Sequence, residues 1–222
     1  MELDHKEMDK VAYLLISYNQ AEYIVSALNS AFRQTFPNLL IVICDDGSTD
    51  GTRELITQFL ETNHTKHRIK TIFNEKNIGF TAFLNSIHEQ ITAKYFIYSS
   101  GDDIASIYKA ETSARLLEKT EMSAVVCNVT CIDKAGSTIH KSFINLPKSP
   151  CEHCNQLNLP YHLVALTDEF IEQVFPVPTG TYAEDQLIMR IAFLCKKFGV
   201  ASTSESLVMY RLTNESVTGR LK

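Results

Sequence analysis

Apolar positions in the first hundred residues form two alternating kinds of segment. Short continuous apolar runs, typical of strands that are covered on both faces, occur at residues 11–16 and 39–44, and residues 68–73 and 94–99 are predicted to be the third and fourth strands. Between these runs apolar residues recur at helical spacing, as in the stretch 80–91. Strands that alternate with helices imply right-handed crossovers and a mostly parallel sheet. The pattern therefore predicts an α/β fold.

The first two predicted helices have recognisable beginnings. Asn19, with Glu22 three residues later, resembles a capping box and predicts the start of a helix. The apolar side of this helix would carry Ile24, Val25, Leu28, Ala31 and Phe32. Asp50 ends the polar loop 45–50 and is predicted to cap the second helix. The apolar side of that helix would carry Leu55, Ile56, Phe59 and Leu60.

The second half of the chain has a less regular pattern. Residues 123–132 and 137–144 are predicted to form an antiparallel pair of strands. Residues 145–182 contain five of the six prolines and are predicted to form an irregular excursion. A helix is expected at 185–198 and a last strand at about 203–210.

Composition and charge are those of an ordinary globular domain. The 222 residues are 45% hydrophobic and 21% charged. The net charge of −5 disfavours a nucleic-acid partner, because such proteins usually carry an excess of Lys and Arg. No apolar run approaches the roughly 20 residues of a membrane span, and the charged N-terminus lacks the apolar region of a signal peptide. We therefore expect one cytoplasmic domain, residues 1–222.

The six cysteines are expected to be reduced thiols, because nothing in the sequence indicates secretion. The segment with Cys151, His153 and Cys154 offers at most three metal ligands. A structural zinc site needs about four. A surface loop is therefore favoured over a metal site at this segment.

Acidic residues gather where predicted strands end or a late helix begins. The three pairs are Asp45/Asp46, Asp102/Asp103 and Glu184/Asp185. Any one pair alone is explained by capping or by the helix dipole. Pairs that meet at one sheet edge repel each other unless a cation or a hydrogen-bond donor compensates, and ligands of open α/β sheets bind at that edge.

Each acidic pair suits a different task. Mg²⁺ or Mn²⁺ takes one or two carboxylates together with substrate phosphates, which suits Asp102 and Asp103 after Gly101. The first pair could accept hydrogen bonds from a nucleoside base or ribose, and the third could supply a general base for an alcohol.

Other nucleotide- and phosphate-handling folds lack their characteristic residues here. No Gly-x-Gly-x-x-Gly follows the first strand, and no Gly-x-x-x-x-Gly-Lys-Ser/Thr loop is present. Ser48 stands where an aspartyl-phosphate phosphatase would have its nucleophile. A receiver-like module would need the acidic pair after the first strand, where there is none.

Several short motifs together carry a family resemblance. They are, in order, Ser17-Tyr-Asn19, Asp45-Asp-Gly-Ser-Thr-Asp-Gly-Thr52, Asn77-Ile-Gly79, Ser100-Gly-Asp-Asp103, Glu184-Asp185 and Tyr210-Arg211. Over residues 10–220 this ordered set resembles the family 2 glycosyltransferases with a GT-A fold. The resemblance implies a Rossmann-like, mostly parallel sheet flanked by helices, with a small antiparallel elaboration in the C-terminal half. It also implies a nucleotide-binding half at about 10–104 and an acceptor-side half at about 105–222.

The activity that the resemblance implies is transfer of a sugar, with inversion, from a nucleotide-sugar to an acceptor hydroxyl. The donor would most often be a UDP-sugar, and the cofactor a divalent metal, Mn²⁺ or Mg²⁺. The acceptor would be a saccharide or a lipid-linked saccharide in bacterial surface polysaccharide or lipopolysaccharide synthesis. A lipid-linked acceptor would bring the protein into peripheral contact with the inner face of the cytoplasmic membrane.

The resemblance also assigns roles to individual residues. The nucleotide would be bound by Ser17, Tyr18, Asp45, Asp46, Asn77, Gly79 and Asp102. Asp102 and Asp103 would bind the metal. Asp185 would be the catalytic base, with Glu184 beside it.

Two positions depart from the family's pattern. Ser100 replaces the first acid of the family's Asp-x-Asp element, and Thr213 stands where many members have a metal-binding His. Both changes remove metal ligands and keep open a GT-A nucleotide-binding module of weak or lost activity. A sugar-phosphate nucleotidyltransferase is the less favoured alternative, because its glycine-rich loop after the first strand is missing.

Overall fold

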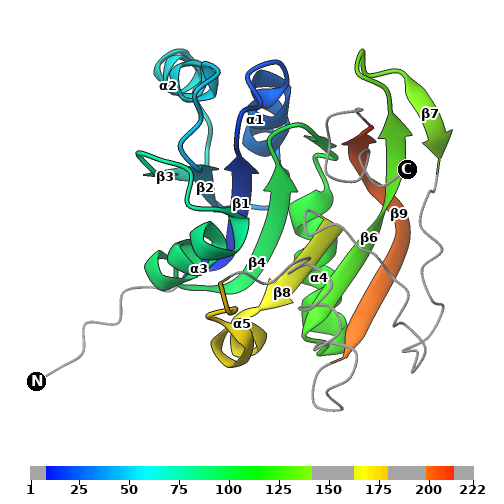
Figure 1. The fold of residues 1–222 in the computed structure, drawn as a ribbon. Coiled ribbons are helices and arrows are strands. Elements are labelled where there is room, and N and C mark those ends of the chain that lie inside the picture. Colours follow the sequence, from blue (N-terminus) through cyan, green and yellow to red (C-terminus); the bar gives the residue numbers. More distant parts are fainter. Residues whose placement is uncertain (1–8, 142–162, 180–198, 213–222) are drawn as a thin grey trace, which may run out of the picture.

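The computed structural model describes residues 9–141, 163–179 and 199–212 (Figure 1). The strands within these residues are β1 Asp9–Ser17, β2 Leu40–Asp45, β3 Arg68–Phe73, β4 Ala93–Ser100, β5 Ile104–Ala105, β6 Ala124–Ile132, β7 Thr138–Lys141, β8 Val164–Thr167 and β9 Val200–Arg211. The helices are α1 Ile24–Phe32, α2 Thr52–Thr62, α3 Phe80–Gln90, α4 Lys109–Thr120 and α5 Asp168–Val174. None of these helices is long and apolar enough to cross a membrane.

The strands form one mixed sheet in the order β3-β2-β1-β4-β8-β6-β9-β5, with β7 paired to β6. Strands β1 to β4 pair in parallel, as do β6 and β9. Strands β5, β7 and β8 pair antiparallel to their neighbours. The predicted α/β class is confirmed, and so is the antiparallel pair in the second half. Because β1, β4, β6 and β9 point the same way in Figure 1, their carboxyl ends share one rim.

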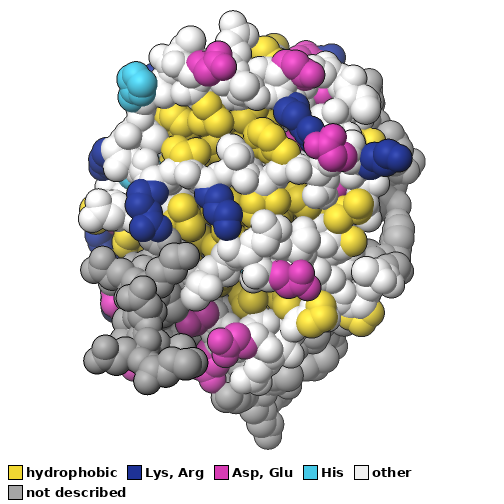
Figure 2. Space-filling view, turned by 90° about the vertical axis from the view of Figure 1, so that its left-hand side faces the viewer, with side chains coloured by type: hydrophobic (Ala, Val, Ile, Leu, Met, Phe, Trp, Pro, Cys, Tyr) yellow, Lys and Arg dark blue, Asp and Glu magenta, His cyan; other side chains and the backbone are white. Residues whose placement is uncertain are grey.

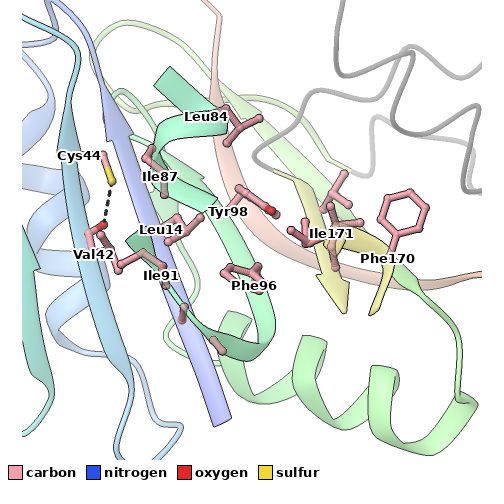
Figure 3. Close-up of a cluster of buried hydrophobic side chains, with 14 of the residues drawn as sticks. Leu14, Val42, Cys44, Leu84, Ile87, Ile91, Phe96, Tyr98, Phe170 and Ile171 are labelled. Carbon is pink, nitrogen blue, oxygen red and sulfur yellow. Dashed lines mark hydrogen bonds between the residues drawn. The ribbon is translucent and has the colours of Figure 1, made fainter. Parts of the chain in front are cut away.

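Alternating side chains of the central strands fill two apolar layers. One layer packs Leu14, Val42 and Phe96 against α3 and α5 (Figure 3). The other packs Tyr13 and Ile41 against α1, α2 and α4. Since burial of a Leu, Ile or Phe side chain is worth about 1.5–3 kcal/mol, both layers hold the sheet under its helices.

Strand β3 is at one edge of the sheet and carries charged residues. Arg68 is exposed and Ile69 is 36% exposed. Figure 2, viewed from this side of the molecule, shows hydrophobic side chains at the surface with Lys and Arg side chains between them. Charged side chains on an edge strand discourage pairing with a second chain.

The capping box predicted at Asn19 and Glu22 was wrong. Helix α1 begins at Ile24, and its N-cap residue, Tyr23, makes no side-chain cap hydrogen bond. Asn19 has a φ of 51°, and its Oδ1 accepts the Thr49 N–H at 2.9 Å. A bond to a distant loop has therefore replaced the local cap.

The excursion predicted at 145–182 contains regular structure where it is described. Strand β8 inserts between β4 and β6, and helix α5 follows it directly. A four-residue strand is too short for its period to be seen in the sequence. No element was predicted where α4 forms, although its buried Ala110, Ala114 and Leu117 have helical spacing. The helix predicted at 185–198 and the Cys151–Cys154 segment lie outside the described residues.

His88 of α3 is partly buried and packs against aromatic side chains. Its Nε2 lies 2.9 Å from the Tyr98 hydroxyl, and its ring centroid lies 4.3 Å from that of Phe175 and 5.0 Å from that of Phe96. This burial lowers the pKa of His88 from 6.5 to about 3. The native state therefore holds His88 neutral at pH values where the unfolded chain protonates it.

We expect His88 to make stability dependent on pH. Between about pH 6.5 and 3 the unfolded state binds a proton that the native state does not. The contribution of neutral His88 to the free energy of unfolding is therefore complete above pH 6.5. Below that pH the free energy of unfolding falls by up to about 1.4 kcal/mol per pH unit. His88→Gln should flatten the decline in free energy of unfolding by about 2 kcal/mol between pH 6.5 and 5, measured by urea titration. His64→Gln, at an exposed histidine, is the control, and parallel curves for both variants would contradict the expectation.

Candidate functional site

The loops that follow the parallel strands continue the hydrogen bonding of the sheet. Asp46 N–H donates to the Ser17 carbonyl at 3.0 Å, and Gly101 N–H donates to the Ile16 carbonyl at 2.9 Å. The ends of β1, β2 and β4 are therefore tied together at the rim. The predicted residues on this rim are Ser17, Tyr18, Asp45, Asp46, Asn77, Gly79, Asp102 and Asp103.

The loops after β1 and β2 bond directly to each other. Asn19 N–H donates to Ser48 Oγ at 2.9 Å, and the Thr49 N–H donates back to the Asn19 side chain at 2.9 Å. Tyr18, whose two neighbours are both anchored in this way, is 47% exposed at the rim. With its neighbours bonded to the loop after β2, the Tyr18 side chain remains accessible at the rim.

The Asp45 carboxylate faces inward. It is 0% exposed and accepts the Ser48 N–H at 3.0 Å, and its Oδ1 lies 2.5 Å from Ser48 Oγ. Arg53 Nε lies 3.5 Å from Asp45 Oδ2. In this arrangement Asp45 shapes the loop after β2 from beneath.

The Asp46 carboxylate holds the loop that follows β3. It accepts hydrogen bonds from Asn74 Nδ2 at 2.8 Å and from the backbone N–H groups of Ile78 and Gly79 at 3.1 Å each. Asp46 is 3% exposed, whereas Ile78 is 50% exposed. Gly47 beside it has a φ of +69°, and a Cβ there would collide with the backbone of Lys76. The acid and the glycine together let the two loops pack closely.

Asp102 lies at the surface of the rim, and its carboxylate is held by a neighbour. Ser100 Oγ donates to Asp102 Oδ1 at 2.5 Å, and Gln20 Nε2 donates to Ser100 Oγ at 3.4 Å. Between them, Gly101 has no room for a Cβ, which would lie 2.9 Å from the Ser17 Cβ. The serine that replaces the family's first acid thus supplies a donor where a second carboxylate would repel Asp102.

Asp103, in contrast, is turned into the protein. It is 1% exposed, and its Oδ1 accepts the Arg211 backbone N–H at 2.9 Å. Burial, and then the charge of Asp102, raise the pKa of Asp103 well above its usual value. The adjacent acids of this pair therefore have opposite environments.

A buried lysine lies beneath Asp103. Lys109 is 1% exposed, and its Nζ donates to the Tyr98 carbonyl at 2.5 Å. Strand β8 pairs with β4 only over Tyr95–Ile97, so the Tyr98 carbonyl lies just beyond that pairing. Burial lowers the pKa of Lys109 to about 8. Sequence reasoning missed this residue, because nothing in the pattern marks one lysine of a helix as buried.

The donors present suit a cation that also binds substrate phosphate. The described residues contain no group of three His, Cys, Asp or Glu side chains that could hold a metal ion. Of the predicted ligands, Asp102 is the partly exposed one and Asp103 the buried one. One carboxylate plus phosphate oxygens is a usual set for Mg²⁺. Glu184, Asp185 and Thr213 lie outside the described residues.

Comparison with known proteins shows the family of this chain. Residues 14–168, more than half of the chain, match the sequence model described as Glycosyl transferase family 2. The chain belongs to glycosyl transferase family 2. The resemblance seen in the ordered motifs is thereby confirmed.

Two curated relatives align with most of this family 2 chain. An uncharacterized glycosyltransferase, alr2836, of Nostoc sp. is 28% identical over 91% of this chain and 65% of its own length. The putative teichuronic acid biosynthesis glycosyltransferase TuaG of Bacillus subtilis is 25% identical over 94% of this chain and 81% of its own length.

Solved structures match the fold of this family 2 chain. A crystal structure of S. aureus TarS in complex with UDP-GlcNAc gives a TM-score of 0.74 at 19% identity, over 93% of this chain and 60% of that one. The mannosyltransferase PcManGT of Pyrobaculum calidifontis, in complex with GDP-Man and Mn²⁺, gives 0.72 at 17% identity, over 95% and 59%. The predicted GT-A fold is confirmed, and the chain spans about 60% of each of these structures.

Removing the Asp46 carboxylate should loosen the loop after β3. Asp46→Ala removes the acceptor of Asn74 Nδ2 and of the Ile78 N–H, while the Gly79 N–H keeps a second bond to Asn77 Oδ1 at 3.1 Å. A buried donor left unsatisfied costs about 1–3 kcal/mol. We expect the free energy of unfolding to fall by about 3 kcal/mol and the amides of Ile78 and Gly79 to exchange faster with deuterium. Glu75→Ala removes an acid that is 93% exposed in the same loop and should change neither. Unchanged exchange at Ile78 and Gly79 would show that Asp46 does not hold the loop.

Proposed function

We propose that this family 2 chain is an inverting glycosyltransferase that moves a sugar from a nucleotide-sugar to an acceptor hydroxyl. One observation carries the proposal: the family's motifs at 17–19, 45–52, 77–79 and 100–103 meet at a single rim. Only part of each relative named above is matched, so the activity is inferred from the family and from this rim. Binding beyond the carboxyl ends of strands is the usual mode of open α/β sheets.

The proposed donor is a UDP-sugar. TarS has been crystallised with UDP-GlcNAc and PcManGT with GDP-Man, which supports a nucleotide-sugar of this general kind. Exposed Tyr18 and Ile78 flank Asp46 and could contact the base. Asp45 and Asp46, which are buried, would act on the nucleotide indirectly, by holding the loops that carry these exposed side chains.

The proposed cofactor is Mn²⁺ or Mg²⁺, which PcManGT's complex with Mn²⁺ supports. When bound, a divalent cation offsets the charge that develops on a departing nucleoside diphosphate. Asp102 would hold the cation, with Ser100 fixing the direction of its carboxylate. Asp103 would support Asp102 from within, because its own carboxylate is buried.

The proposed catalytic base is Asp185, with Glu184 beside it, on the family's pattern. The base would take the proton of the acceptor hydroxyl as that oxygen attacks the sugar from the face opposite the diphosphate. The acceptor side would be built by residues 105–222, which include β6, β7 and β9. All of this assumes a single domain over residues 1–222.

The acceptor that we propose is a saccharide or lipid-linked saccharide of a bacterial surface polymer. The teichuronic acid role printed for TuaG supports this choice. The protein would act in the cytoplasm, at the inner face of the membrane where the acceptor is lipid-linked. The alternative is a nucleotide-binding module without activity. It is favoured by Ser100 in place of an acid, and by the burial of Asp103, which leaves Asp102 as the accessible acid of the described segment 100–103.

Nucleotide-sugars with Mn²⁺ should raise the melting temperature of the protein. A ligand at 100 times its Kd adds about 2.7 kcal/mol, which corresponds to about 5–10 °C for a domain of this size. We expect UDP-sugars to give the largest shift in a thermal-shift screen with and without Mn²⁺. Asp102→Asn should remove the Mn²⁺-dependent part, whereas Glu61→Gln, at an exposed acid of α2, should keep it. Absence of a shift with every nucleotide-sugar would refute the proposed donor class.

Asp185→Asn should separate binding from transfer. Loss of a general base typically lowers the rate by about 10²- to 10⁴-fold, while a distant donor site stays intact. We therefore expect normal Mn²⁺-dependent donor binding and strongly reduced sugar transfer. Transfer is measured as the nucleoside diphosphate released in the presence of acceptor. Glu184→Gln is the matched control and should lose less. Near-normal transfer by Asp185→Asn would remove Asp185 from the mechanism, and donor binding without transfer by the wild-type chain would favour the inactive module.

A further inference from the structure

Arg211, at the end of β9, is buried, and its guanidinium hydrogen-bonds to backbone carbonyls. It is 4% exposed. Its guanidinium donates to three backbone carbonyls: Nε to Asp102 at 2.9 Å, and Nη1 to Asp133 at 2.9 Å and to Lys134 at 2.8 Å. A buried charge is tolerated only where hydrogen bonds compensate for lost water. These three carbonyls supply that compensation, and they belong to two loops far apart in the sequence.

The same residue contacts two further segments. Its backbone N–H donates to Asp103 Oδ1 at 2.9 Å, and its Cζ lies 4.5 Å from the centroid of the Tyr23 ring, just before α1. The turn between β6 and β7 also contacts the segment before α1 separately, because Lys134 Nζ lies 3.0 Å from Glu22 Oε2. Arg211 therefore contacts three segments at the rim: the loop with Asp102 and Asp103, the turn between β6 and β7, and the residue before α1.

Asp102 is held from two directions as a result. Ser100 bonds its carboxylate, and Arg211 bonds its carbonyl. Two supports on one residue restrict the direction in which its free carboxylate oxygen points. Outer groups that orient a ligand of a metal commonly govern affinity for that metal.

The guanidinium is not needed to attach β9 to this part of the fold. Strand β5 already pairs with β9 through Ile104 to Met209 and Ala105 to Val208, and β6 pairs along most of β9. The side-chain bonds of Arg211 are additional, and they go to the Asp102 segment and to the turn after β6. Their removal should therefore disturb Asp102 more than it disturbs the sheet.

We propose that Arg211 is a positioning residue that holds Asp102 ready for a divalent cation and joins the turn between β6 and β7 to the same site. The inference rests on the proposed function, because it concerns the metal–diphosphate site proposed there. It gives a role to Arg211 of the Tyr210-Arg211 motif. It also links the turn between β6 and β7, in the proposed acceptor-side half, to the segment 100–103 that would hold the metal.

The test is the dependence of UDP binding on Mn²⁺, measured by calorimetry and by the electron paramagnetic resonance signal of free Mn²⁺. In Arg211→Met we expect the half-saturating Mn²⁺ concentration to rise about 10- to 100-fold, with UDP binding in the absence of metal unchanged. Arg211→Lys keeps the charge and one donor, and should recover part of the loss. Arg115→Met removes an arginine whose side chain is 72% exposed on α4 and should match the wild type.

Wild-type half-saturation in Arg211→Met would overturn the inference. If that variant does not fold, Arg211→Lys and Tyr23→Leu, which removes the stacked ring together with the Tyr23 bond to Glu22, replace it and should shift the Mn²⁺ dependence in the same direction. No shift in either would equally overturn the inference. Failure of the wild-type chain to bind UDP or GDP with Mn²⁺ would instead overturn the proposed function, so the two failures are distinguishable.

Discussion

Parallel strands that end at one edge bring the loops after them into contact, and those loops must satisfy one another's polar groups. The bonds from Asp46 to Ser17 and from Gly101 to Ile16 do this with backbone alone. Side chains then complete the network, above all the Asp46 carboxylate, which accepts three donors of the loop after β3. Because a buried donor without an acceptor is costly, this edge allows few alternative arrangements.

The same constraint separates acids that are identical in the sequence. Asp45 and Asp103 are enclosed by strands and helices and act on the protein itself. Asp102 is partly exposed, with its carboxylate bonded by Ser100 and its backbone carbonyl bonded by Arg211. Burial of Lys109 beneath Asp103 places a titratable cation close to this element without exposing it. The electrostatics of the rim thus arise from the division between inward and outward carboxylates.

Prediction succeeded where one local signal determined the structure. The predicted strands match β1 to β4 within one or two residues, and helical spacing located α3. It failed where distant contacts decided the outcome. Asn19 bonds to the loop after β2 in place of capping α1. Strand β8 is stabilised by β4 and β6 on its two sides and has no period of its own to detect.

The family, the fold class and the set of candidate residues were all present in the order and spacing of the motifs, because each motif is a local run of a few residues. That Asp45, Asp46 and Asp103 are buried while Asp102 is partly exposed was not, since burial depends on segments from elsewhere in the chain. The role of Arg211 is the clearest case, because its partners at Tyr23, Asp102, Asp133 and Lys134 are distant in sequence. Only folding the sheet brings those backbone carbonyls within reach of one guanidinium.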